Sequence, residues 1–237
     1  MDRIDKIIAS QGQYSRSEVK KLIKAGRVTV DGKIPKNGDV KADPNVSVIA
    51  IDGKAMGYKK HIYIMLNKPQ GVVSATDDRD HKTVIDLVPK ELKREGLFPA
   101  GRLDADTVGF VLITDDGDFA HKILSPKNHI MKTYHALLQR ELTREDIEAF
   151  RNGIELRDGT LCLEAEVSPI EGDEPMAQIK ICEGKYHQVK RMFAALGNKV
   201  LYLKRVKMGG LCLDENLEEG KCREITPQEL ELIQAKE

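Results

Sequence analysis

Three charged side chains alternate along one short segment, where Arg102, Asp104 and Asp106 precede an apolar block at 110–113. In an extended chain, side chains two residues apart point the same way, so the three could meet at one site. A carboxylate beside a cation can act as an acid, a base or a nucleophile. From spacing alone either aspartate could be the reactive group, and both could instead cap a turn or pair with Arg102.

Two other segments offer partners for such a carboxylate. In 183–196, a glycine turn leads into a predicted helix with Lys190 and Arg191 in its first turns. Cations there oppose the helix dipole, a cost accepted where a phosphate or carboxylate binds, although a helix with mixed faces also shows this pattern. Tyr134 lies on an alternating segment at 132–138. A tyrosine on a strand usually packs, and it gains a role only if it lies against the other two segments.

The histidines and cysteines lack the spacing of a metal site. The six histidines show no ligand spacing with cysteine or carboxylate, and the four cysteines form no CxxC pair. Motifs for nucleotides and redox cofactors, such as GxGxxG and GxxxxGK[ST], are absent. We therefore expect no metal, no cofactor and reduced thiols. Acid–base or nucleophilic chemistry by carboxylate, tyrosine and lysine remains.

Strands outnumber helices in the part of the chain that must position these residues. The predicted strands lie at 62–66, 110–113, 132–138, 161–167, 176–182, 200–206 and 211–213, and the predicted helices at 83–88, 118–124, 144–152, 187–196 and after Thr226. Asp116-Gly117 favours a tight turn after the 110–113 strand. Because strands and helices do not alternate regularly, we predict an α+β domain with a mainly antiparallel mixed sheet.

Charge separates the start of the chain from the rest. Residues 1–60 carry 13 Lys and Arg residues against 7 Asp and Glu residues, whereas the whole chain has 38 of each kind. A basic stretch of this kind suggests a module that binds a polyanion. After a capping box at 15–18, cations recur every three or four residues and should share one side: Arg16, Lys20, Lys24 and Arg27. A solvated helix face is the plain alternative to nucleic-acid binding.

The segment RIDKIIASQGQYSRSEVKKLIKAGRVTVDGKIPKNGDV resembles the S4 RNA-binding domain. The resemblance implies a small α/β domain that holds structured RNA through phosphate contacts, with strong salt dependence and little sequence choice. We expect this S4-like domain to occupy residues 1–57, a linker to follow at 58–61, and a catalytic domain to occupy 62–237.

Four ordered blocks of the second domain resemble the RsuA branch of the pseudouridine synthases, which modify ribosomal RNA. In chain order they are LNKPQGVVSA, GRLDADTVGFVLITDDG, KTYHALL and EGKYHQVKRMFAALGNKVLYLKRVKMGGLCLD. The resemblance implies that Asp104 is the catalytic aspartate and Arg102 its neighbour in the motif. It makes Tyr134 the tyrosine that stacks on the target base, and Lys190 the cation that pairs with the carboxylate. The substrate-binding candidates are the sequence neighbours of Lys190, namely Gln188, Val189 and Arg191. Of these, Val189 matches an apolar position near the base.

This resemblance implies that a specific uridine becomes pseudouridine after the nucleotide is flipped out of the RNA. The DADT sequence and the EGKYHQVKRMFAALGN block are most similar to the small-subunit, 16S rRNA enzymes, because large-subunit relatives usually differ at Asp106. The alternatives are a 23S rRNA enzyme of the same branch, a non-catalytic S4-type assembly factor and a nucleosidase-like hydrolase. With no apolar run of membrane-spanning length and no secretory signal, we expect a cytoplasmic monomer that binds ribosomal RNA.

Overall fold

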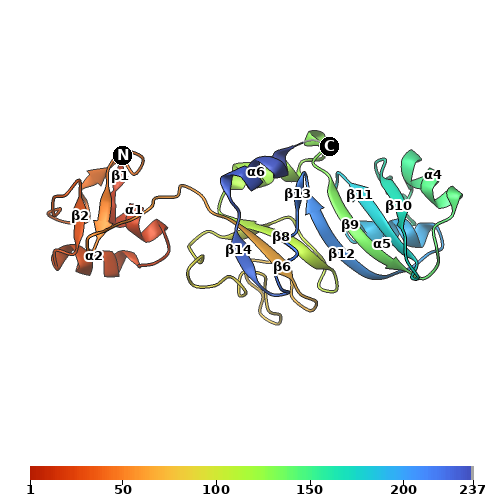
Figure 1. Ribbon diagram of the computed structural model, residues 1–237, viewed down its shortest axis with the longest axis horizontal. Helices are drawn as coiled ribbons and strands as arrows, with labels where there is room; N and C mark the ends of the chain where they lie inside the picture. The colour runs from red at the N-terminus through yellow and green to blue at the C-terminus, as the bar shows by residue number, and fades with distance from the viewer. Residues whose placement is uncertain (236–237) are drawn as a thin grey trace. The chain divides into compact units, whose positions relative to one another are not determined.

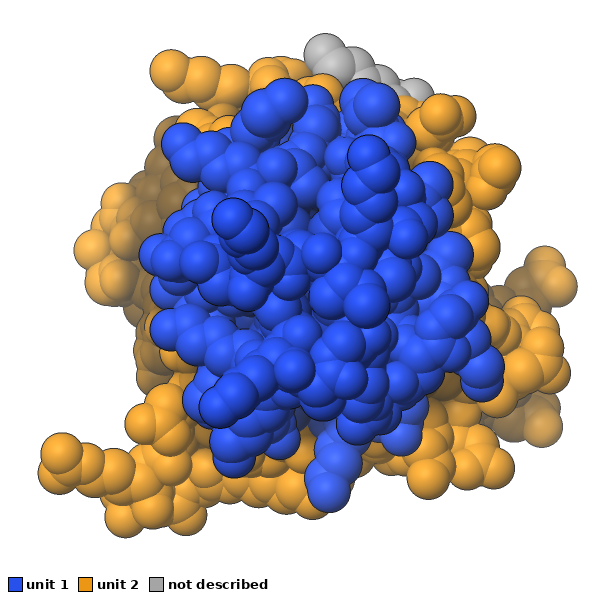
Figure 2. Space-filling model, turned by 90° about the vertical axis from the view of Figure 1, so that its left-hand side faces the viewer, with its two compact units in different colours: residues 1–62, 88–97 blue, residues 63–87, 98–237 orange. Residues whose placement is uncertain are grey.

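The computed structural model describes residues 1–235 and divides the chain into two compact units (Figures 1 and 2). Unit 1 contains residues 1–62 and 88–97, and unit 2 contains residues 63–87 and the chain from 98 onward. The return of 88–97 to unit 1 was not predicted, because this polar segment has no periodic pattern. The predicted helix at 83–88 is wrong, since Thr83 and Asp86 close only a short turn there, with Thr83 N donating to Asp86 Oδ2 at 2.8 Å.

Unit 1 combines two helices with two small antiparallel sheets. The helices are α1 (Ile4–Ser10) and α2 (Arg16–Lys24). One sheet pairs β1 (Asp2–Arg3) with β3 (Lys41–Ala42), and the other has the order β2 (Val28–Val30), β4 (Ile49–Ile51) and β5 (Lys54–Ala55). Their apolar side chains form one core, which contains Ile4, Ile7, Ile8, Val19, Leu22, Ile23, Val28, Ala42 and Ile49.

Local sequence fixes both ends of α2, the helix with the predicted row of cations. At its start, Ser15 and Glu18 form the predicted capping box, in which the Ser15 side chain accepts from Glu18 N and Glu18 accepts from Ser15 N. At its end, Gly26 adopts a left-handed φ of 71°, and Arg27 N donates back to Leu22 O at 3.0 Å. The helix therefore buries its apolar face and leaves its lysines in solvent.

One large sheet organises unit 2 (Figure 1). Its main path contains, in spatial order, β10 (Glu166–Ile170), β11 (Met176–Ile181), β9 (Lys132–Leu138), β12 (Val200–Met208), β8 (Val108–Thr114), β6 (Tyr63–Lys68) and β14 (Cys222–Glu224). Two short strands pair with its centre, β7 (Phe98–Ala100) with β8 and β13 (Leu211–Cys212) with β12. Among the strand pairs of the described residues only β8–β12 is parallel, so the predicted mixed, mainly antiparallel sheet is confirmed.

The parallel pair requires a residue without a side chain. Gly109 in β8 lies opposite Arg205 in β12 and has a φ of 98°. A Cβ atom at Gly109 would lie 2.3 Å from the Arg205 carbonyl oxygen, far inside van der Waals contact. Glycine thus allows β8, which is buried along its whole length, to approach β12 closely.

Helices and a 3-10 turn complete the described part of unit 2. They are α3 (Gly117–Leu124), η1 (Pro126–Asn128), α4 (Arg144–Asn152), α5 (Gln188–Ala195) and α6 (Pro227–Gln234), of which α5 contacts β12. Asp116 does not form the predicted tight turn; its side chain accepts from Phe119 N at 3.0 Å and caps α3. No helix in the described residues is long and apolar enough to cross a membrane.

Candidate active site

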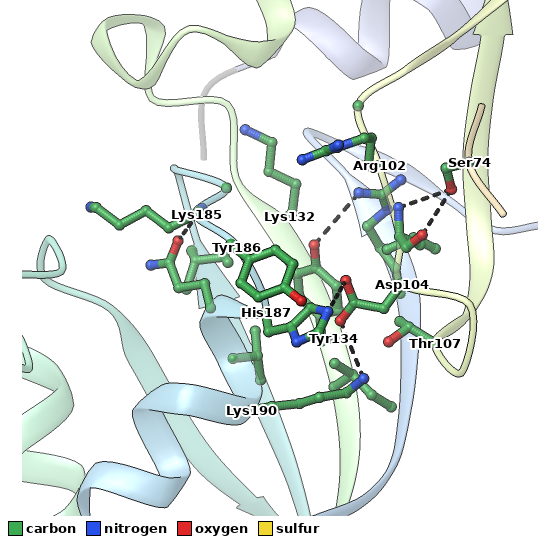
Figure 3. Close-up of a pocket in the computed structure, with 18 of the residues that line it drawn as sticks. Ser74, Arg102, Asp104, Thr107, Lys132, Tyr134, Lys185, Tyr186, His187 and Lys190 are labelled. Carbon is green, nitrogen blue, oxygen red and sulfur yellow. Dashed lines mark hydrogen bonds and ion pairs between the residues drawn. The ribbon is translucent and has the colours of Figure 1, made fainter. Parts of the chain in front are cut away.

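A cavity of about 510 Å³ opens in unit 2 beside the centre of the sheet (Figure 3). The segment before β8, the loop before α5, and strands β9 and β12 supply most of its wall. It is lined by three of the predicted catalytic residues that lie far apart in sequence, Asp104, Tyr134 and Lys190. The fold thus brings together the segments that the sequence analysis could only treat separately.

Two side chains from 68–74 hold the segment that carries Asp104. The Ser74 hydroxyl donates to Leu103 O at 2.9 Å and accepts from Leu103 N at 3.0 Å. Lys68, which is fully buried, donates from Nζ to the carbonyl oxygens of Ala105 at 3.2 Å and Thr107 at 2.8 Å. The Asp104 carboxylate, 27% exposed, is therefore presented on a fixed turn. This turn replaces the extended segment that the spacing suggested.

Each carboxylate oxygen of Asp104 faces a nitrogen from the α5 region (Figure 3). Lys190 Nζ donates to Oδ2 at 3.2 Å, and His187 Nε2 lies 3.4 Å from Oδ1. Lys190 also donates to Asp106 Oδ1 at 2.5 Å, and this bond lowers the pKa of the more exposed Asp106. The two aspartates consequently share one ammonium group, and of the two only Asp104 also has His187 within 3.4 Å.

Tyr134 lies in the wall of the cavity beside a buried cation. Tyr134 in β9 is directly opposite Arg205 in β12, and only 7% of the tyrosine is exposed. Arg205 donates from Nε to Phe110 O at 2.7 Å and from Nη1 to the Tyr134 hydroxyl at 3.5 Å. Its Nη2 is buried without a partner among the described residues. Arg205 thus fixes the tyrosine hydroxyl and keeps one donor available.

Burial changes the acidity of two lysines near this site. Desolvation lowers the pKa of Lys68 to about 8, although the charges of Asp106 and Asp104 act in the opposite direction. Desolvation also lowers the pKa of Lys132 to about 8, helped by the nearby charge of Arg205. Lys132 Nζ donates to the carbonyl oxygen of Cys182 at 3.0 Å. Both ammonium groups therefore lose their protons far below the ordinary lysine range.

The loop before α5 is held by a buried carboxylate. Glu183 accepts from Leu163 N at 2.9 Å and from Gln188 Nε2 at 2.6 Å, and it also pairs with Lys185. Gln188 Oε1 accepts in turn from Lys185 N at 2.8 Å. Gln188 lines the cavity, but the nitrogen and the oxygen of its side-chain amide both form hydrogen bonds within this loop. Its placement therefore supports a positioning role instead of the predicted substrate contact.

Two predicted arginines have different surroundings from those expected. Arg102 lines the cavity and is exposed, but it makes no hydrogen bond or ion pair within the described chain, so the pairing with Asp104 that its spacing allowed is not formed there. Arg191 is not among the residues that line the cavity. It pairs with Asp158 at 2.5 Å and donates to Tyr186 O at 3.3 Å. Val189 is buried in the cavity wall, as an apolar neighbour of a base should be.

In unit 1, three of the four predicted phosphate contacts are exposed along α2, namely Arg16, Lys20 and Lys24. The fourth, Arg27, is also exposed, but it forms a bidentate ion pair with Asp52 in the turn after β4, at 2.7 and 2.5 Å. This pair was not predicted, because 25 residues of sequence separate its members. Lys68 and Arg205 were not predicted either, because Lys68 lies in the break after the predicted 62–66 strand and Arg205 follows Lys204 in the predicted 200–206 strand.

Comparison with known proteins decides the family. The chain matches RNA pseudouridylate synthase over residues 62–195 and the S4 domain over residues 2–46. It is 46% identical to YtzG of Bacillus subtilis (strain 168), an uncharacterized RNA pseudouridine synthase, over 98% of each chain. The chain belongs to the RNA pseudouridylate synthase family. The family resemblance noted from the sequence is therefore confirmed.

Other relatives agree over the whole length of this synthase. It is 42% identical to ribosomal small subunit pseudouridine synthase A of Escherichia coli (strain K12), over 96% of this chain and 98% of the relative. A crystal structure of a pseudouridylate synthase superposes with a TM-score of 0.68 at 40% identity, covering 98% of this chain and 100% of that one. The similarity therefore extends over the S4 domain and the synthase fold together.

Proposed function

We propose that this synthase converts a specific uridine of small-subunit, 16S ribosomal RNA to pseudouridine. The observation that carries the proposal is Asp104 at the cavity wall, with Lys190 on one carboxylate oxygen, His187 on the other, and Tyr134 in the same cavity. The small-subunit assignment is supported by the full-length similarity to ribosomal small subunit pseudouridine synthases A at 40–43% identity.

The proposed chemistry requires one ionised carboxylate and a closed space in which a base can turn. The bond from the ribose C1′ to N1 breaks, the uracil rotates, and a bond from C1′ to C5 forms. C5 loses a proton and N1 gains one, so the composition of the RNA is unchanged. Asp104 acts as nucleophile or base, Lys190 offsets its charge, and Tyr134 with Val189 holds the flipped base.

The two units have separate tasks in this proposal. In chain order we keep the predicted bounds, with the S4-like RNA-binding domain at 1–57, the linker at 58–61 and the catalytic domain at 62–237, although 88–97 groups with unit 1. The exposed cations on α2 support phosphate binding by the first part, which sets affinity and orientation without reading sequence. The cavity residues then select and isomerise the uridine. We propose that the enzyme acts as a monomer.

Mapping the modification tests this function directly. The purified protein is incubated with unmodified 16S and 23S transcripts and with early small-subunit particles, and pseudouridine is located by carbodiimide labelling and primer extension. We expect one new stop in 16S RNA, and none with Asp104→Asn. A stop only in 23S RNA would contradict the small-subunit assignment, and RNA binding without any modification would favour an assembly factor. Release of free uracil would identify a hydrolase.

A further inference from the structure

An exposed aromatic side chain stands at the mouth of the cavity. Tyr186 is 68% exposed although its side chain is large, and it lines the same cavity as Asp104. Its ring stacks on the imidazole of His187, with 3.8 Å between ring centroids and 20° between planes. His187 thus covers one face of the Tyr186 ring (Figure 3), and most of the tyrosine remains exposed.

The chain holds this stacked pair in a defined position. His187 has a left-handed backbone with φ of 47°, which is uncommon for a residue with a side chain and concentrates at functional sites. Its imidazole lies 3.4 Å from Asp104, so the pair is connected to the proposed catalytic carboxylate. Arg191, fixed by Asp158, donates to the carbonyl oxygen of Tyr186. The ring of Tyr186 is therefore held in position as an aromatic surface at the cavity.

We propose that the outer face of Tyr186 stacks on an unpaired RNA base adjacent to the target uridine. This inference rests on the proposed function. Flipping a uridine out of a folded RNA unstacks its neighbours, and aromatic side chains bind such bases irrespective of their identity. Arg102, the exposed cation without a partner among the described residues, lines the same cavity and supplies a contact for the phosphate between the two nucleotides.

Two substitutions at Tyr186 separate stacking from simple bulk. Tyr186→Phe keeps an aromatic face, whereas Tyr186→Leu keeps apolar volume and removes the face. We expect the leucine variant to lower kcat/KM on the RNA about tenfold through a higher KM, and the phenylalanine variant to stay within about twofold of the parent. Tyr202→Leu is the matched control, because Tyr202 on β12 is 39% exposed and does not line the cavity.

A fluorescent base reports the contact itself. RNAs carry 2-aminopurine immediately 5′ or immediately 3′ of the mapped uridine, and quenching is followed on binding to protein. At one of the two positions we expect quenching with the parent and with Tyr186→Phe, and markedly less with Tyr186→Leu. Equal quenching by all three proteins, or by none, would overturn the proposal. So would a leucine variant that loses kcat at unchanged KM, because Tyr186 would then only support His187.

Failure of the proposed function is distinguishable from failure of this inference. If the parent enzyme forms no pseudouridine in any ribosomal RNA, the function falls whatever Tyr186 does. If the parent modifies its uridine and Tyr186→Leu matches it in kcat/KM, the stacking site falls and the function stands.

Discussion

Lys190 Nζ lies 3.2 Å from Asp104 Oδ2, across 86 residues of sequence. The lysine is in the first turn of α5, and the aspartate is on the turn before β8. The same ammonium group donates to Asp106 at 2.5 Å, so the two carboxylates compete for one cation. Asp104 differs from Asp106 in having His187 as a further neighbour and in facing the cavity with a less exposed carboxylate.

The shared cation predicts opposite outcomes for two isosteric substitutions. Asp104→Asn should abolish pseudouridine formation, by more than about a thousandfold in kcat, because the carboxylate charge is lost while the side-chain size is kept. Asp106→Asn should change kcat by less than about tenfold, because Lys190 is then free to pair with Asp104 alone. Single-turnover assays on the mapped RNA measure both, and circular dichroism with RNA-binding curves checks folding. Equal losses would reassign the catalytic aspartate.

The two buried lysines predict an alkaline limit to activity. Lys68 and Lys132 have pKa values of about 8, so their charges disappear as pH rises through 8. A neutral Lys68 amine can no longer donate to all three of its carbonyl partners, two of which belong to the turn that carries Asp104. We therefore expect kcat/KM to fall between about pH 8 and 9.5, as measured on a short RNA.

The contribution of these two lysines to the free energy of unfolding should rise over the same alkaline range in which kcat/KM falls. Between about pH 8 and the ordinary lysine pKa of 10.5, the unfolded chain retains protons that folded Lys68 and Lys132 have lost. Because the unfolded state binds more protons, these two groups make folding more favourable as pH rises. Urea unfolding at each pH separates lost activity from lost structure. A kcat/KM that stays constant between about pH 8 and 9.5 would contradict the predicted alkaline limit to activity.

Gly109→Ala should damage both the sheet and the site. The added Cβ would meet the backbone of Arg205 at 2.3 Å, and alanine also resists a φ of 98°. We expect a loss of about 3 kcal/mol in the free energy of unfolding, together with lower activity because Arg205 moves away from Tyr134. Gly159→Ala is the control, since its φ is 81° but nothing lies within 4 Å of the added atom. Similar losses for both variants would show that close strand packing is unimportant.

Glu229 should make the catalytic unit sensitive to acid. Arg223 donates hydrogen bonds to the Glu229 carboxylate, and they are the main reason why the pKa of Glu229 is lowered to about 2. The same arginine also pairs with Asp214. The stabilisation is complete above the ordinary pKa of 4.5 and is lost as pH falls through about 2. Glu229→Gln should cost about 1–2 kcal/mol at neutral pH, and the difference from the parent should shrink as the pH falls below the ordinary glutamate pKa. Glu231→Gln on the same helix is the control, and a difference that stays constant in acid would contradict this origin.

The cations of α2 should set salt-dependent affinity and not the choice of uridine. Replacing Lys20 and Lys24 by glutamine should weaken RNA binding at low salt. It should also reduce the slope of log K against log salt concentration by about 0.7–0.9 for each phosphate that is no longer neutralised. Filter-binding titrations over a range of salt concentrations measure this slope, with Lys127→Gln in unit 2 as the charge control. An unchanged slope would show that the α2 face does not bind phosphate.

Local elements and the family were predictable from the order of amino acids. The capping boxes begun by Ser15, Thr143 and Thr226 are present because each depends on hydrogen bonds between residues three apart. Strand β9 has the predicted bounds, and from Tyr134 onward its buried and half-buried residues alternate as the pattern indicated. The order of the motif blocks was enough to predict the synthase family and its S4 domain. The catalytic roles of the motif residues stay predictions.

The meeting of charged groups depends instead on how the chain packs. Spacing along the sequence allowed Arg102 to pair with Asp104, but packing supplies Lys190 and His187 and leaves Arg102 exposed. An ion pair depends on a distance of a few ångströms in space. A sequence pattern shows only which side chains point the same way along one helix or strand. The antiparallel pairing of β12 with β9 places Arg205 opposite Tyr134, while the parallel pairing of β12 with β8 places the same arginine against Gly109. A fold that joins distant segments is required for both contacts.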